Sequence, residues 1–189
     1  MKPTNNWANT AASNGQSERL TAGGHICRIK HAEAAQSRAG REMLKVYIDI
    51  AEGTDKDGFF ERKWKMNTAK KWPNDGTIYQ LTTDKDGNTN PRFKGLIQSV
   101  EQSNGSWKWT WDENQLKGKL IGVVFGEEEY QGSDGQIRTA IKPRYTCAAG
   151  KAMEQPAPTP HTLAERPEEQ APAAQETFTE VQDDELPFE

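Results

Sequence analysis

The chain is poor in the residues that build metal centres, disulfide frameworks and membrane spans. It contains three histidines and two cysteines, Cys27 and Cys147, which share no metal-type spacing. We expect both cysteines to be small strand residues in a reducing compartment, although the sequence alone leaves a disulfide open. No apolar run approaches the ~20 residues of a membrane span, and residues 1–24 lack the apolar segment of a signal peptide. These absences predict a cytoplasmic protein with no membrane partner.

Common catalytic motifs are missing as well. The sequence has no phosphate-binding loop ending in Gly-Lys-Ser/Thr, no His-Glu-x-x-His and no Gly-x-Ser-x-Gly. Four side chains could together bind zinc: His25, Cys27, His31 and Cys147. On one extended strand, however, the two clustered histidines stand too far apart for a single ion. Two Asp-rich turns lack the glutamate that completes a calcium loop. Because neither a catalytic motif nor a complete set of metal ligands is found, we expect no metal, no other cofactor and no enzymatic activity.

What the chain does have is an uneven distribution of charge. Residues 1–150 contain 22 Lys and Arg against 18 Asp and Glu, a net charge of +4. Residues 151–189 contain 2 against 10, a net charge of −8. Hydrophobic residues make up 33% of the chain, which is low for a wholly globular protein. The sequence therefore predicts one mildly basic domain with polar appendages and an acidic end.

The composition divides the chain into four parts. Residues 1–22 are rich in Asn, Ser, Thr and Ala, and we expect a disordered N-terminal arm. Residues 23–149 contain the apolar patterns of a folded domain. Residues 150–182 are dominated by Pro, Ala, Glu, Gln and Thr, which is typical of a disordered linker. Residues 183–189 form an acidic tip.

Period-two patterns predict a mostly β domain. The clearest is at 43–50, where every second residue is apolar, and the Ser-Asp-Gly turn at 133–135 predicts a hairpin. We expect strands over 25–31, 43–50, 107–111, 118–130 and 136–147, helices over 59–71 and 92–103, and a short strand or extended link over 77–82. An OB-fold-like small barrel with one or two short helices fits this content best, and a small sandwich-like α+β sheet is the alternative.

Basic and aromatic residues occur together in several segments of this domain. Single-stranded nucleic acid is bound by cations along its phosphates and by aromatic faces on which its bases stack. The nucleic-acid-binding surface that we expect draws on Arg28, Lys30, Lys45, Tyr47, Lys63, Trp64, Lys65, Lys70, Lys71, Trp72, Trp107, Lys108, Trp109, Trp111, Arg138, Lys142, Arg144 and Tyr145. For any one tryptophan in a small β domain, a place in the core is the more frequent alternative.

The acidic tip has the features of a peptide ligand. Three carboxylates precede an apolar segment: Asp183, Asp184 and Glu185 stand before Leu186, Pro187 and Phe188. The acids suit a basic partner surface, and Phe188 is the one large side chain that can fill a pocket. Pro187 fixes φ and lowers the entropy lost on docking. An ordinary solvated acidic tail is the alternative.

The tip resembles the end of the bacterial single-stranded DNA-binding proteins, which has the pattern Asp-Asp-x-x-Pro-Phe. Asp183, Asp184, Pro187 and Phe188 occupy these places here, whereas Glu189 follows where the family's chain ends. The stretches GREMLKVYIDIAEG, KGLIQSVEQSN and KGKLIGVVFGEEEY resemble phage and mobile-element proteins that are regarded as single-stranded DNA-binding proteins. The resemblance implies an OB fold and a tip that recruits replication, recombination and repair enzymes.

Together these features predict a protein that coats single-stranded DNA with little sequence preference during replication or recombination. Partner enzymes would dock at residues 183–188, and a homo-oligomer is compatible with this function. The alternative is a protein–protein adaptor whose tail docks a helicase or nuclease without DNA binding. A nuclease activity is disfavoured because the acidic residues of the domain are scattered in turns and in one run, 127–129.

Overall fold

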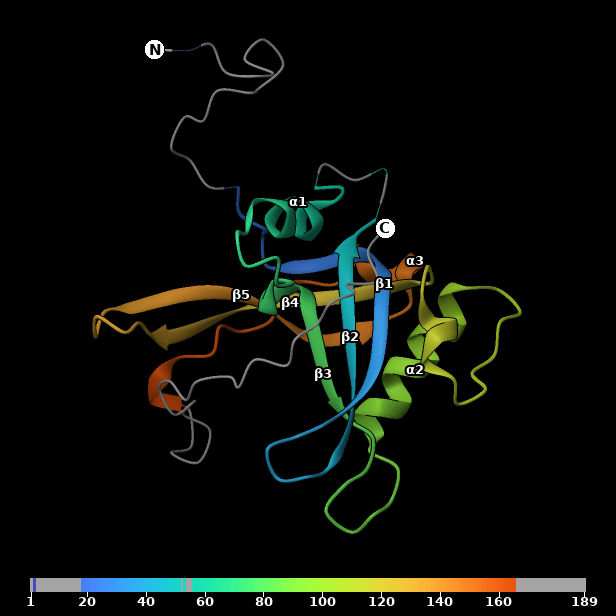
Figure 1. The fold of residues 1–189 in the computed structure, drawn as a ribbon. Coiled ribbons are helices and arrows are strands. Elements are labelled where there is room, and N and C mark those ends of the chain that lie inside the picture. The colour runs from blue at the N-terminus through green and yellow to red at the C-terminus, as the bar shows by residue number, and fades with distance from the viewer. Residues whose placement is uncertain (1, 3–17, 52, 54–55, 166–189) are drawn as a thin grey trace.

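The computed structural model describes residues 2, 18–51, 53 and 56–165. Its strands and helices, drawn in Figure 1, are β1 (Gly23–Gln36), β2 (Glu42–Ile50), α1 (Phe59–Met66), β3 (Thr77–Leu81), α2 (Pro91–Ser103), β4 (Leu120–Gln131), β5 (Ile137–Cys147) and α3 (Ala149–Ala152). The prediction of a mostly β domain is confirmed, as are the helix at 92–103 and the hairpin of β4 and β5.

All five strands belong to one antiparallel sheet with the order β3-β2-β1-β4-β5. Strands β2 and β3 cross β4 and β5 at a steep angle, and α1 and α2 lie near opposite ends of the crossed strands (Figure 1). Strands β3 and β5 are the two edges, and no strand pairing joins them in the described part of the chain. The sheet is therefore unclosed, with its core between the two crossed halves.

Strand β1 connects the two halves and is longer than expected. It pairs with β4 from Gly23 to Arg28 and with β2 from Cys27 to Gln36. A bulge between Ile29 and His31 shifts the register with β2, and bulges bend the strand that carries them. The sequence prediction ended this strand at residue 31 because the next residues read as a polar connection. Pairing with β2, which is a long-range interaction, extends it to Gln36.

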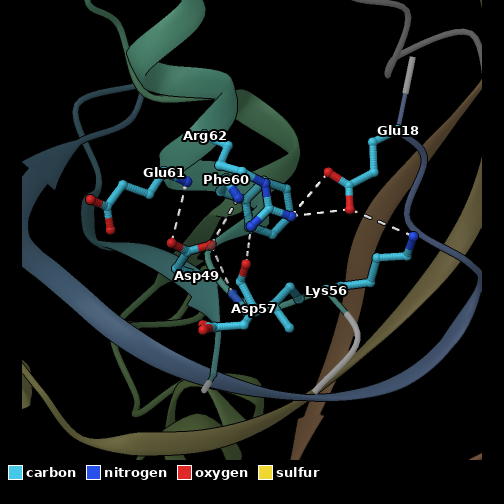
Figure 2. A network of polar contacts seen from close by, with 8 residues as sticks. Glu18, Asp49, Lys56, Asp57, Phe60, Glu61 and Arg62 are labelled. Carbon is cyan, nitrogen blue, oxygen red and sulfur yellow. Dashed lines mark hydrogen bonds and ion pairs between the residues drawn. The ribbon is translucent and has the colours of Figure 1, made fainter. Parts of the chain in front are cut away.

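The ordered structure also begins earlier than residue 23. Leu20 is buried in the hydrophobic core. Glu18 forms ion pairs with Arg62 of α1 and with Lys56, at 3.0 and 3.6 Å (Figure 2). Hydrogen bonds from Arg62 lower the pKa of Glu18, which keeps the carboxylate charged. The expected arm over 1–22 thus includes residues that pack against the domain, and residues 1 and 3–17 lie outside the described part.

Helix α1 begins beside a buried carboxylate. Asp49 of β2 accepts hydrogen bonds from the backbone N–H groups of Phe60 and Glu61 at 2.8 and 3.2 Å, as Figure 2 shows. These groups have no partner within the helix, and an anion there is also favoured by the helix dipole. Burial raises the pKa of Asp49, against the opposing effect of the backbone donors. A side chain of the sheet therefore supplies the N-terminal cap of α1.

The same helix is shorter than the predicted 59–71. It ends at Met66, because Asn67 adopts an extended backbone (φ −75°, ψ 120°) and its side chain accepts a hydrogen bond from the N–H of Ala69. Asparagine commonly starts a turn in this way. Trp72 and Pro73, which were expected to end the helix, follow in an irregular segment.

Residues 107–111 were expected to form a strand, and this prediction is wrong. The segment is irregular, and Trp111 has a left-handed backbone with φ of 64°. The side chain of Asp112 then caps a short 3-10 turn over Glu113–Leu116. Aromatic alternation here reflects packing of the indoles on one another rather than a pleated backbone.

Residues 153–165, which we call the C-terminal strap, run back along the sheet. The N–H of Gly24 donates to the carbonyl of Gln155, and Ala152, just before the strap, is buried. His161 forms a parallel bridge with Glu128 of β4. The expected linker over 150–182 therefore begins with residues that contact the domain, and residues 166–182 lie outside the described part.

Three further features of the described residues concern membranes, metals and thiols. No helix in them is long and apolar enough to cross a membrane. They contain no group of three or more His, Cys, Asp or Glu side chains placed to hold a metal ion. Cys27 and Cys147 are free thiols, and burial raises the pKa of both.

Candidate nucleic-acid interface

A wide cleft lies between the two open edges of the sheet. It has a volume of about 1580 Å³, which exceeds the ~300–1,000 Å³ of most small-molecule pockets. Its walls come from β3 and the segment before it, β5, the end of β1 and its following loop, one face of α2, two residues of β2 and one of β4. The charged and aromatic residues that line it are Arg38, Lys45, Lys71, Tyr79, Arg92, Glu128, Lys142, Arg144 and Tyr145. We call this feature the basic cleft.

The basic cleft carries a strong excess of positive charge. Six of its lining residues are basic and one is acidic, a net charge of +5, whereas residues 1–150 together carry +4. Arg38 and Arg92 form no ion pair within the described residues. A cleft lined with one sign of charge attracts a polyanion and concentrates its field inside.

One wall is ordered by a carboxylate that joins β1 to β2. Glu33 accepts hydrogen bonds from Lys45 at 2.9 Å and from the hydroxyl of Tyr47 at 2.7 Å. Burial opposes the charge of Lys45, but its hydrogen bonds with Tyr47 and Glu33 raise its pKa to about 12. Lys45 also lies over the ring of Tyr47, with Nζ 4.8 Å from the centroid. Lys45 therefore stays charged and is held in a fixed position in the cleft wall.

The opposite wall is formed by β5. Lys142 donates to Glu128 of β4 at 2.8 Å, and Arg144 lies 3.8 Å from the same carboxylate. Arg144 also contacts His161 of the C-terminal strap and donates to the carbonyl of Glu127 at 2.9 Å. The single acidic residue of the cleft is thus shared by two cations, and the strap helps to position one of them.

Two tyrosines on the facing strands present aromatic surface to the cleft. Tyr79 of β3 is 49% exposed and Tyr145 of β5 is 44% exposed. Their hydroxyl groups make only long hydrogen bonds, Tyr79 to Asn74 at 3.4 Å and Tyr145 to Gln155 at 3.5 Å. A half-exposed ring in a cationic cleft is suited to stacking on a base.

Five of the predicted binding residues meet in the basic cleft: Lys45, Lys71, Lys142, Arg144 and Tyr145. Three lining residues were missed from the sequence, namely Arg38, Arg92 and Tyr79. Arg41 follows Arg38 closely, but no aromatic residue accompanies this pair, and no basic residue lies close to Tyr79 in the sequence. Arg92 stands at the first turn of α2, where only the packing of that helix turns it toward the cleft.

A second group of predicted residues lies around α1, away from the cleft. Arg28, Lys30 and Lys65 border a small polar pocket together with Asp49 and Glu61. Lys30 and Lys65 each lie 2.8 Å from the Glu61 carboxylate. Hydrogen bonds from these two lysines lower the pKa of Glu61 to about 2. The charges of this group are largely compensated within the protein.

The aromatic residues of the α1 region are also occupied. Trp72 is 7% exposed, and its indole N–H donates to the carbonyl of Gly76 at 3.1 Å. Its ring packs against Tyr47 and Trp64, so no face remains for a base. Trp64 is half-buried and donates to the carbonyl of Lys70. Trp72 thus belongs to the core. For this tryptophan the core position, expected from the sequence as the alternative to DNA binding, is the observed one.

The remaining cations of the α1 region are engaged locally. Lys63 pairs with Asp75 at 2.7 Å and lies over the ring of Phe59. Lys70 donates to the carbonyl of Lys65.

Arg138 lies apart from both groups, at the end of the β4–β5 hairpin. It pairs with Asp134 of the turn at 2.6 Å. The predicted residues Trp107, Lys108, Trp109 and Trp111 form a further surface beside α2. The predicted docking residues Asp183, Asp184, Glu185, Leu186, Pro187 and Phe188 lie outside the described part.

Neither the protein-family models nor the curated proteins include a match to this chain.

Proposed function

We propose that the protein binds single-stranded DNA in the basic cleft with little sequence preference, in replication or recombination. The observation that carries this proposal is the lining of the cleft, with six basic residues against one acidic residue and two half-exposed tyrosines on facing strands. Cations along the backbone and aromatic faces for the bases are the two elements of sequence-tolerant binding to single strands.

The topology supports the same proposal. We propose that the sheet is an OB-type barrel that stays open between β3 and β5. The strand order β3-β2-β1-β4-β5, with α2 between β3 and β4 in the chain, is compatible with a five-stranded Greek-key barrel. In such barrels oligonucleotides bind the face of the second and third strands and the loop after the first strand. Lys45, Tyr79 and Arg38 come from these places.

The recruiting role of the tip belongs to the same proposal and rests on its sequence. Residues 183–188 combine three acids with Leu-Pro-Phe, and a replication or recombination enzyme with a basic, apolar pocket is the partner that this chemistry fits. No part of the proposed function requires a catalytic residue.

The cleft can be tested with two variants of equal charge change. Arg38→Ser/Arg92→Ser removes two cations of the cleft, and Lys56→Ser/Lys65→Ser removes two cations of the α1 region. Fluorescence anisotropy with labelled oligo-dT at rising salt should show weaker binding for the first variant only. For single strands each phosphate contact contributes about 0.7 to the slope of log K against log salt, so we expect the slope to fall by about 1.4.

Two outcomes would contradict the proposal. One is an affinity for duplex DNA that equals or exceeds the affinity for oligo-dT in the unmodified protein. The other is an equal loss in both variants, which would show that overall charge rather than the cleft determines binding. If the protein does not change the anisotropy of labelled oligo-dT at any salt concentration, the protein–protein adaptor becomes the better assignment.

A further inference from the structure

We propose that Trp111 forms a second stacking contact for the same nucleic-acid strand, on the side of α2 that faces away from the basic cleft. This inference rests on the proposed function and extends it, because it predicts a binding site that continues beyond the cleft. The surface consists of Trp107, Trp109 and Trp111 with Lys108 and Lys119, and we call it the tryptophan platform.

Helix α2 separates the platform from the cleft. Arg92, Gly95 and Leu96 of this helix line the cleft. On another face of the helix, Phe93 contacts the ring of Trp111 at a centroid distance of 6.2 Å, and Glu101 accepts a hydrogen bond from the N–H of Trp109 at 3.1 Å. A helix is ~10–12 Å across with its side chains, so a strand must leave the cleft and pass α2 to reach Trp111.

The three indoles of the platform are in contact but are not equally buried. The centroids of Trp107 and Trp109 lie 6.4 Å apart, and those of Trp109 and Trp111 lie 6.3 Å apart. Trp107 and Trp109 pack against the core, whereas Trp111 is 73% exposed. Trp111 therefore rests on a fixed aromatic base and presents most of its ring to solvent, where an apolar group of this size is otherwise unfavourable.

The backbone at Trp111 is held in a costly conformation. Its φ of 64° lies in the left-handed region, which bulky residues rarely adopt. Such residues persist only when the surrounding structure determines them, and they cluster at ligand-binding sites. Here the next residue, Asp112, caps the 3-10 turn, and the side chain of Thr110 donates to Gln115 at 2.9 Å. The loop thus fixes the direction of an exposed ring.

Cations lie beside the aromatic rings. Lys119 Nζ is 5.3 Å from the ring centroid of Trp107. Lys108 is exposed and pairs with Glu101 at 3.2 Å. The hydrogen bond from the Trp109 N–H lowers the pKa of Glu101, so this carboxylate remains charged and holds both the lysine and the backbone of the loop. Cations next to a stacking face are the combination that binds the phosphates and bases of a single strand.

The inference is tested by the dependence of affinity on strand length. With oligo-dT of about 5 nucleotides, near the lower end of the ~4–16 nucleotides that one OB fold binds, Trp111→Ala should bind as the unmodified protein does. With oligo-dT of about 16 nucleotides the same variant should bind roughly 5- to 150-fold more weakly, the effect of one lost stacking contact. Trp111→Phe should retain most of the affinity. Met66→Ala, which removes a similarly exposed apolar side chain at the end of α1, should have no effect at either length.

Other results would overturn the inference, and each has a distinct meaning. An equal loss at both lengths would place Trp111 in the cleft site itself, and no loss at either length would assign the platform to a different partner. Trp111→Gly serves as a second variant, because glycine adopts the left-handed backbone without strain and the fold is then retained. If Arg38→Ser/Arg92→Ser leaves short-strand binding intact while Trp111→Ala weakens binding to long strands, the cleft proposal fails and the platform survives.

Discussion

The basic cleft and the α1 region both combine basic with aromatic residues, but the cleft has the larger excess of basic residues and the more exposed aromatic rings. Around α1, Lys30 and Lys65 share Glu61, and Trp72 is part of the core. In the cleft Lys45 pairs with Glu33, and Lys142 and Arg144 share Glu128, but Arg38 and Arg92 form no ion pair within the described residues and two tyrosines are half exposed. The difference shows that a mixture of basic and aromatic residues in the sequence does not define a binding surface. What decides is whether acidic partners and core contacts reach the same residues from other elements.

The largest expected difference between the two regions is in stability. Replacing Trp72 by alanine should lower the free energy of unfolding by roughly 3–5 kcal/mol, because a buried indole and its hydrogen bond to Gly76 are lost. Urea denaturation followed by circular dichroism measures this change. The affinity of the remaining folded protein for oligo-dT should be unchanged. A stable variant with weakened DNA binding would show that Trp72 is a ligand-contacting residue after all.

The second prediction concerns the aromatic residues of the cleft. Tyr145→Ala should weaken binding to oligo-dT by ~1–3 kcal/mol, the contribution of one stacked base. Because the ring is 44% exposed, its loss should change the free energy of unfolding by less than about 0.5 kcal/mol. Tyr145→Phe, which keeps the ring, should bind nearly as well as the unmodified protein. An equal loss for Phe and Ala would assign the effect to the hydroxyl group instead.

The smallest effect is expected from the ion pairs of the α1 region. The pKa of Glu61 is lowered from 4.5 to about 2, so its stabilising contribution is present above pH 4.5 and is lost as the pH falls toward 2. Because the pairs are partly exposed, the contribution should be below about 1 kcal/mol. Glu61→Gln should therefore be slightly less stable at pH 7 and equal to the unmodified protein near pH 2. Urea denaturation at both values tests this, and a constant difference would exclude the ion pairs as its cause.

Much of the fold could be predicted because the signals were local. The alternation at 43–50 predicts β2, and the apolar spacing over 92–103 predicts α2. The end of β1 could not be predicted, because its Ala- and Gln-rich residues become a strand only by pairing with β2. Residues 107–111 were wrongly predicted as a strand because here a local pattern was present but did not determine the backbone. Their alternation is strand-like, but ring packing and the conformation of Trp111 determine the backbone.

The candidate site was predicted in part. Lys142, Arg144 and Tyr145 carry a local signal on one strand, and they do line the cleft. Arg38 has no aromatic neighbour in the sequence. Arg92 stands beside Phe93 and Lys94, but its place in the cleft depends on how α2 packs between the edges β3 and β5, which the sequence does not show. Ion pairs between distant segments could not be predicted from the sequence either, since Glu61, the partner of Lys30, is 31 residues away.

The C-terminal strap limits where the chain can be shortened without loss of solubility. β4 leaves β1 after Phe125, and its following residues would present an unpaired edge on which another chain could add a strand. His161 covers part of that edge through backbone hydrogen bonds of 2.9 and 3.0 Å with Glu129 and Glu127. A truncation at residue 149, where the composition changes, would uncover the edge and remove Ala152 from the interior. Such a fragment should aggregate, whereas one that ends after residue 165 should stay dispersed.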